Sequence, residues 1–175
     1  MIRHVVWKIF VLCLVVAFAG CAGAPKAKVY SSSPKVQKVS NPSFDSEIEP
    51  VFAKDGRHYD AFLFSFTNKT GGELYIDWEN TFYLFNSRKN GLFGWEGMDW
   101  EALEKTKKHP LVKVPAGITH TVEIFPLKLA GRDMRVSTVS HPYLKGFLPA
   151  GENGILLAVK VGEKTLQETM NVVIK

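Results

Sequence analysis

The chain contains few cysteines and no hydrophobic run long enough to cross a bilayer. Only two of its 175 residues are cysteine, so a fold held together by many disulfides is excluded. No apolar run reaches the roughly 18 residues that a transmembrane helix needs. The composition, 46% hydrophobic and 22% charged, excludes a disordered chain and a collagen-like repeat. The length allows one domain, with room for a tail.

The sequence also lacks the short motifs that mark common catalytic centres. It contains no G-x-S-x-G, H-E-x-x-H, Walker or C-x-x-C pattern. Four histidines follow residue 50, and none stands at metal-ligand spacing from another: His58, His109, His120 and His141. We therefore expect no enzyme activity, no metal and no cofactor.

Two groupings of reactive residues have simpler interpretations. Asp77 and Glu79 alternate along an expected strand, which would place them about 7 Å apart, as in glycosidases. We interpret them as a solvated strand face, because a carboxyl group that acts as an acid must also be desolvated. Ser137, Ser140 and His141 lack a nucleophile elbow and an orienting carboxylate nearby, so no catalytic role is expected for them.

Residues 1–20 have the composition of a secretory signal peptide. Arg3 and Lys8 give a positive start, and an unbroken apolar run of 12 residues extends from Ile9 to Gly20. Such a run suits the hydrophobic part of a signal peptide and is too short for a transmembrane helix. A buried core helix would show polar residues at helical spacing, and this run has none. We expect a signal helix.

Small residues precede a cysteine at the end of this run. The segment Phe18-Ala19-Gly20-Cys21 resembles the lipobox of bacterial lipoproteins, with Phe18 in place of the usual leucine. The resemblance implies cleavage between Gly20 and Cys21, and acylation of Cys21 with two or three palmitate-like chains that anchor it stably in a lipid bilayer. Cys13 lies inside the apolar run and would leave with the signal. An ordinary cleavage site beside a chance cysteine is the alternative.

In lipoproteins, the residue after the acylated cysteine, here position 22, indicates the membrane to which the protein is sorted. It is Ala rather than Asp, which by the sorting rule of Gram-negative lipoproteins implies the outer membrane. We expect a lipid-anchored protein of the bacterial cell envelope, on its periplasmic or its surface face. With Cys13 removed and Cys21 acylated, no thiol is left to form a disulfide.

Residues 21–43 are expected to combine the lipidated cysteine with a flexible, disordered tether. Ala22 to Ser43 contains three prolines, three consecutive serines and four lysines, but no acidic residue, which is typical of a linker. Fully extended, these residues reach about 75 Å. The lysines either contact anionic lipid headgroups or keep the spacer soluble.

The net charge of +5 arises before the expected domain. All 17 acidic residues, but only 16 of the 22 basic ones, lie in residues 44–175. This part of the chain is therefore nearly neutral. A nucleic-acid-binding surface would need clustered basic residues on the folded part, so no nucleic-acid partner is expected.

Residues 44–175 are expected to form one all-β domain. Alternating side chains at 62–66 and 74–78, separated by a turn at 68–72, predict a hairpin. Trp78 is expected in the core. Further strands are expected at 82–85, 118–125, 155–161 and 165–174. In the strand that begins at Ile118, the side chains of Ile118, Val122 and Ile124 are expected to point inward.

The order of these elements predicts an antiparallel β-sandwich of about seven or eight strands. One short helix is expected at residues 99–105, in the long connection between residues 86 and 113. The order resembles that of immunoglobulin-like domains, without their cystine. Residues 64–78 are also similar to a segment of short bacterial lipoproteins that has no known activity.

Trp95 and Trp100 are the residues we single out for contact with a partner. They lie in the long connection, and aromatic rings in such connections commonly bind partners. Our leading hypothesis is a non-enzymatic envelope protein whose sandwich binds an envelope protein or serves envelope assembly. The alternative is a module whose tryptophans stack on peptidoglycan or surface polysaccharide. The two rings could instead cap the open end of the sandwich.

Overall fold

The computed structural model describes residues 27–98, 108–132 and 143–175. These residues form fourteen β-strands, several of them only two residues long, and one 3₁₀ turn, η1 (Leu127–Leu129). The predicted all-β class is confirmed. The signal helix expected at 1–20 and the short helix expected at 99–105 lie outside the described residues.

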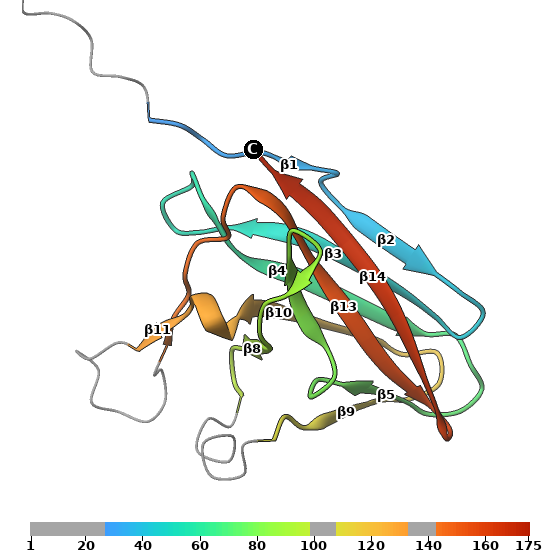
Figure 1. The fold of residues 1–175 in the computed structure, drawn as a ribbon. Helices are drawn as coiled ribbons and strands as arrows, with labels where there is room; N and C mark the ends of the chain where they lie inside the picture. Colours follow the sequence, from blue (N-terminus) through green and yellow to red (C-terminus); the bar gives the residue numbers. More distant parts are fainter. Residues whose placement is uncertain (1–26, 99–107, 133–142) are drawn as a thin grey trace, which may run out of the picture.

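Two antiparallel sheets pack against each other around a shared core (Figure 1). The first, here called the β4 sheet, has the strand order β2-β3-β4-β10-β8. Its strands are β2 (Gln37–Ser40), β3 (Phe44–Phe52), β4 (Tyr59–Asn68), β10 (Thr119–Pro126) and β8 (Phe93–Trp95).

The second sheet, here called the β13 sheet, has the order β1-β14-β13-β5-β9, with β6 also paired to β13 and β7 paired to β6. Its strands are β1 (Ser32–Ser33), β5 (Leu74–Asp77), β6 (Phe82–Phe85), β7 (Arg88–Lys89), β9 (Leu111–Val114), β13 (Gly151–Val161) and β14 (Lys164–Ile174). A separate two-stranded sheet joins β11 (Gly131–Arg132) to β12 (Tyr143–Leu144).

The core is built from alternate residues of strands in both sheets. Phe62, Phe64 and Phe66 of β4 are fully buried, because one face of an extended strand carries every second side chain. From the other sheet, β13 contributes the buried side chains of Ile155, Leu157 and Val159. Trp78 is buried as predicted, and its ring lies edge-on to that of Phe64, with centroids 5.4 Å apart.

The predicted hairpin between residues 62–66 and 74–78 is wrong. β4 pairs with β3 and β10, whereas β5 pairs with β13 and β9. The turn crosses between sheets, and the buried side chain of Asn68 holds it: Nδ2 donates to the carbonyl oxygens of Gly72 (2.7 Å) and Val114 (2.9 Å). Both strands therefore turn apolar residues toward one core from opposite sides.

The flexible tether predicted for residues 21–43 is wrong from Ser32 onward. β1 pairs with β14 and β2 pairs with β3, and the backbone N–H of Tyr30 already donates to the carbonyl of Arg57 at 2.9 Å. The folded domain thus begins near residue 30 rather than 44. Composition was misleading because β2 is a polar edge strand, with only alternate residues partly covered.

The strand expected at 118–125 is present with one difference in orientation. β10 begins at Thr119, and Ile118 is 50% exposed. Val122 and Ile124 contribute to the core, as predicted. The difference arises because Ile118 belongs to the preceding turn, where its N–H donates to the carbonyl of Pro115 at 3.2 Å.

Candidate functional site

Trp95 lies at the end of β8, paired with Ile124 of β10. Its ring is half-buried and packs against the core, 5.1 Å from the ring of Trp78 and 6.3 Å from that of His109. Trp100 lies outside the described residues. Only one of the two rings singled out from the sequence is therefore placed, and that ring packs against the core.

His109 supports this corner from inside. It is 8% exposed, and its Nε2 lies 3.0 Å from the carbonyl oxygen of Phe93. A carbonyl oxygen can only accept, so Nε2 carries the proton. Burial lowers the pKa of His109, although the bond to Phe93 opposes that shift. The histidine is therefore a neutral donor that ties the segment before β9 to β8.

The solvated strand face predicted for Asp77 and Glu79 is wrong. β5 ends at Asp77, which is 2% exposed, whereas Glu79 is exposed beyond the strand end. Asp77 Oδ2 accepts from Asn80 Nδ2 at 3.0 Å and lies 3.2 Å from Lys160 Nζ. The two carboxylates are thus in different environments, which does not match a glycosidase pair.

The contacts of Asp77 keep it ionised. Burial on its own raises the pKa of this carboxyl group, but the hydrogen bonds from Asn80 and Lys160 outweigh burial and bring the pKa below its usual value. The carbonyl of Asp77 also accepts from Thr81 Oγ1 at 2.8 Å. The hydrogen bonds and the ion pair of Asp77 therefore fix the backbone where the chain leaves β5.

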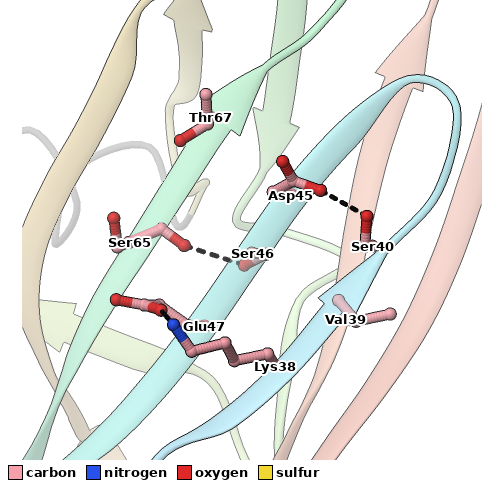
Figure 2. Close-up of a pocket in the computed structure, with 8 residues that line it drawn as sticks. All are labelled: Lys38, Val39, Ser40, Asp45, Ser46, Glu47, Ser65 and Thr67. Atoms are coloured by element: carbon pink, nitrogen blue, oxygen red, sulfur yellow. Dashed lines mark hydrogen bonds and ion pairs between the residues drawn. The ribbon is translucent and has the colours of Figure 1, made fainter.

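A groove lined mainly by polar and charged residues crosses strands β2, β3 and β4 (Figure 2). It has a volume of about 310 Å³. The lining residues come from three neighbouring strands: Lys38, Val39, Ser40, Asp45, Ser46, Glu47, Ser65 and Thr67. Sequence reasoning missed this groove, because β2 lies in the segment assigned to the tether and the other strands show only ordinary alternation.

Each charged group of the groove has a partner of opposite charge. Lys38 Nζ lies 2.6 Å from Glu47 Oε2. Asp45 Oδ1 accepts from Ser40 Oγ at 2.5 Å and from Lys69 Nζ at 2.9 Å, and these bonds lower the pKa of Asp45. Hydroxyl groups continue the surface onto β10, where Thr67 Oγ1 lies 2.8 Å from Thr119 Oγ1. The surface offers alternating donors and acceptors to a polar partner.

Two further findings concern the part of the chain that the structure describes. Within it, no group of three His, Cys, Asp or Glu side chains is arranged to hold a metal ion. Residues 27–98, 108–132 and 143–175 also include no helix of the length and apolar character needed to cross a membrane.

Comparison of the chain with protein-family models, with curated proteins and with solved structures found no match.

Proposed function

We propose that the protein is a non-enzymatic lipoprotein of the bacterial cell envelope, anchored in the outer membrane through acylated Cys21. In this proposal it presents an immunoglobulin-like β-sandwich to an envelope protein partner. One observation carries the proposal: Phe18-Ala19-Gly20-Cys21 ends a 12-residue apolar run. A folded domain follows this motif closely, since Tyr30 is already hydrogen-bonded to it.

Three acid or base groups of the domain support binding rather than catalysis. Asp77 is held by Asn80 and Lys160, and His109 donates to a backbone carbonyl. Asp45 accepts from two side chains of its own surface. A general acid or base needs a pKa near the working pH and a free path to substrate, whereas these groups hold strands and turns together.

Exchange of the N-terminal signal tests the anchor in cells. Residues 1–21 would be replaced by an ordinary secretory signal, cleaved before Ala22. We expect the natural chain in the membrane fraction, extracted only by detergent, and the exchanged chain in the soluble envelope fraction, because it lacks the acyl chains. Recovery of both chains in the soluble fraction would contradict the proposal.

Glycan binding is the second candidate function. The groove of Figure 2 favours it, because its carboxylates and hydroxyls are groups that exchange hydrogen bonds with sugars. Trp95, which is only half-buried, could add a stacking surface at another edge of the same sheet.

Co-sedimentation with purified sacculi separates the two candidates. Saturable binding by the chain from residue 22 onward, lost in a folded Trp95→Ala/Trp100→Ala variant or a folded Asp45→Asn/Thr67→Ala variant, would establish the glycan module. The protein-partner proposal predicts no such binding, and recovery of a specific envelope protein by crosslinking in whole cells.

A further inference from the structure

One end of the sandwich carries aromatic rings that remain in contact with solvent. Phe52, at the end of β3, is 45% exposed, and Phe147, before β13, is 52% exposed. The ring of Phe52 stacks on Tyr59 with centroids 4.2 Å apart, and the ring of Phe147 stacks on His58 at 4.4 Å. The ring of Tyr30 also lies beside that of His58, with centroids 5.0 Å apart. These five residues are called the end cluster below.

Hydrogen bonds hold the end cluster in place. Asp55 accepts from the backbone N–H groups of Arg57 (2.8 Å) and His58 (3.0 Å), and its Oδ2 lies 2.5 Å from His58 Nδ1. These bonds keep the pKa of Asp55 far below its usual value. The N–H of Leu148 donates to the carbonyl of Tyr59 at 2.7 Å. These hydrogen bonds therefore fix the backbone next to the two exposed rings.

Three basic side chains lie on the segments that carry the end cluster. Lys28, Lys54 and Arg57 are exposed, and Lys28 Nζ lies 4.6 Å from the centre of the Tyr30 ring. Of the acidic residues nearby, Asp55 is turned back onto His58, and the half-buried Asp60 lies within electrostatic reach of Lys145. Aromatic rings flanked by cations are characteristic of the boundary between lipid and water, where cations also meet anionic headgroups.

The position of the end cluster relative to Cys21 is the decisive point. The first described residues run along the same end as the connection between β3 and β4 (Figure 1), where Tyr30 bonds to Arg57. Eight residues separate Cys21 from Tyr30, a reach of about 30 Å at full extension. The 11 residues of β13 place the opposite end about 35 Å farther away.

We propose that the end cluster docks onto the surface of a lipid bilayer that contains anionic headgroups. Phe52 and Phe147 enter the headgroup region, and Lys28, Lys54 and Arg57 contact the anionic groups. This inference rests on the proposed anchor at Cys21 and adds to it that the domain has one orientation. The turn at Pro115–Ile118, at the opposite end, then faces away from the membrane.

A site-specific fluorophore on a tethered chain tests this orientation. The chain from residue 22 onward contains no cysteine, so a single cysteine can be labelled with a polarity-sensitive dye. A hexahistidine tag before residue 22 would hold the chain on vesicles that contain nickel-chelating lipid and phosphatidylglycerol, independently of natural acylation. We expect a blue shift of the dye at Phe147→Cys and none at Ile118→Cys, which is matched in exposure.

Substitutions then separate insertion from mere proximity. Phe52→Ser and Lys54→Glu/Arg57→Glu are each expected to remove most of the blue shift at position 147. Lys164→Glu, an exposed lysine at the opposite end, should leave it unchanged. The charge variant should have no effect on vesicles of phosphatidylcholine that hold the same nickel lipid, where the remaining shift would depend on the rings alone.

Three results would overturn the inference. One is a dye at position 147 that does not respond to vesicles. Another is an equal response at 118 and 147, and the third is a shift without vesicles that grows with protein concentration, which would mark contact between two copies. The state of Cys21 is measured separately, on the natural protein. If Cys21 is acylated but the dye at position 147 shows no shift, docking is refuted and the anchor stands. If the dye shifts but Cys21 is not acylated, only the anchor is refuted.

Discussion

At the scale of single residues, Asp77 shows how a carboxylate that looks catalytic can be structural. Replacing it by Asn removes the charge that faces Lys160 and one acceptor for Asn80. We expect Asp77→Asn to lower the free energy of unfolding by about 1–3 kcal/mol, measured by urea denaturation at pH 7. The control is Glu73→Gln, which breaks the exposed pair with Lys113 and should cost less than about 1 kcal/mol.

The effect of Asp77→Asn should also depend on pH. The pKa of Asp77 is lower in the folded chain than in the unfolded one, so the carboxylate stabilises the fold above its unfolded pKa of about 4. This contribution is lost as the pH falls through the lower pKa that Asp77 has in the folded chain. The difference between the two chains should therefore be smaller at pH 3 than at pH 7. An equal difference at both pH values would contradict the assignment.

His109 gives a second pH dependence, at a higher pH. Because burial lowers its pKa in the folded state, the unfolded chain binds the proton more tightly. The contribution of His109 to the free energy of unfolding is fully present above about pH 6.5. It decreases as the pH falls through the lower pKa that His109 has in the folded chain. His109→Gln keeps a donor for Phe93 and should flatten the decline between pH 7.5 and 5.5, measured by urea denaturation. His120, whose pKa burial also lowers, contributes a slope of the same sign.

Sequence patterns could not identify these two roles. Asp77 meets Lys160, which lies far along the chain on β13, and His109 meets the backbone of β8. Alternation predicted that Asp77 points away from Ile76 and Trp78, but not that another element covers it. Burial of a polar residue depends on long-range pairing, which a local pattern does not contain.

At the scale of the elements, the pairing of β13 with β14 requires a glycine at position 154. Gly154 lies opposite Asn171, and a Cβ atom there would meet Asn171 Oδ1 at 2.0 Å and the carbonyl of Met170 at 2.3 Å. Gly154→Ala should lower stability by about 1–3 kcal/mol, because the backbone of β14 must move. Gly71→Ala is the control, since nothing lies within 4 Å of its Cβ position. Equal melting temperatures for the two variants would contradict the close approach.

The N-terminal strands give a prediction about the domain boundary. A chain that starts at residue 44 lacks β1, β2 and the partly buried side chains of Tyr30 and Val39. We expect it to be less stable by about 1–3 kcal/mol than a chain that starts at residue 27, since full burial of a large apolar side chain contributes roughly 1.5–3 kcal/mol and these two are only partly buried. Thermal unfolding followed by circular dichroism measures the difference. The same melting temperature for both chains would restore the boundary at residue 44.

Individual strands were easier to predict than their partners. The strand at 82–85 and the buried face of Phe62, Phe64 and Phe66 follow from local alternation and are confirmed. The hairpin was wrong because Asn68 redirects the chain through hydrogen bonds to Gly72 and Val114. The groove was missed for a related reason: it exists only where β2 lies beside β3.

At the scale of the whole molecule, the early start of the fold limits how far the domain could move from a membrane in the lipid-anchored protein that we propose. The reach between Cys21 and the domain falls from about 75 Å to about 30 Å, because the domain begins at Tyr30, ahead of β1 and β2, and not at residue 44. In the anchored protein that we propose, a spacer this short would keep the end cluster close to the bilayer. The opposite end, at Pro115–Ile118, would then be the part of the sandwich that reaches farthest toward a partner.

The most direct test of the proposed lipid anchor is the mass of the N-terminal peptide of the protein isolated from membranes. Trypsin should release residues 21–26, because Lys26 is the first basic residue after Cys21. We expect a peptide that begins at Cys21 and carries a diacylglyceryl group, with or without a third acyl chain on the amine. A peptide that begins elsewhere, or an unmodified Cys21, would contradict the lipid anchor on which the proposed function rests.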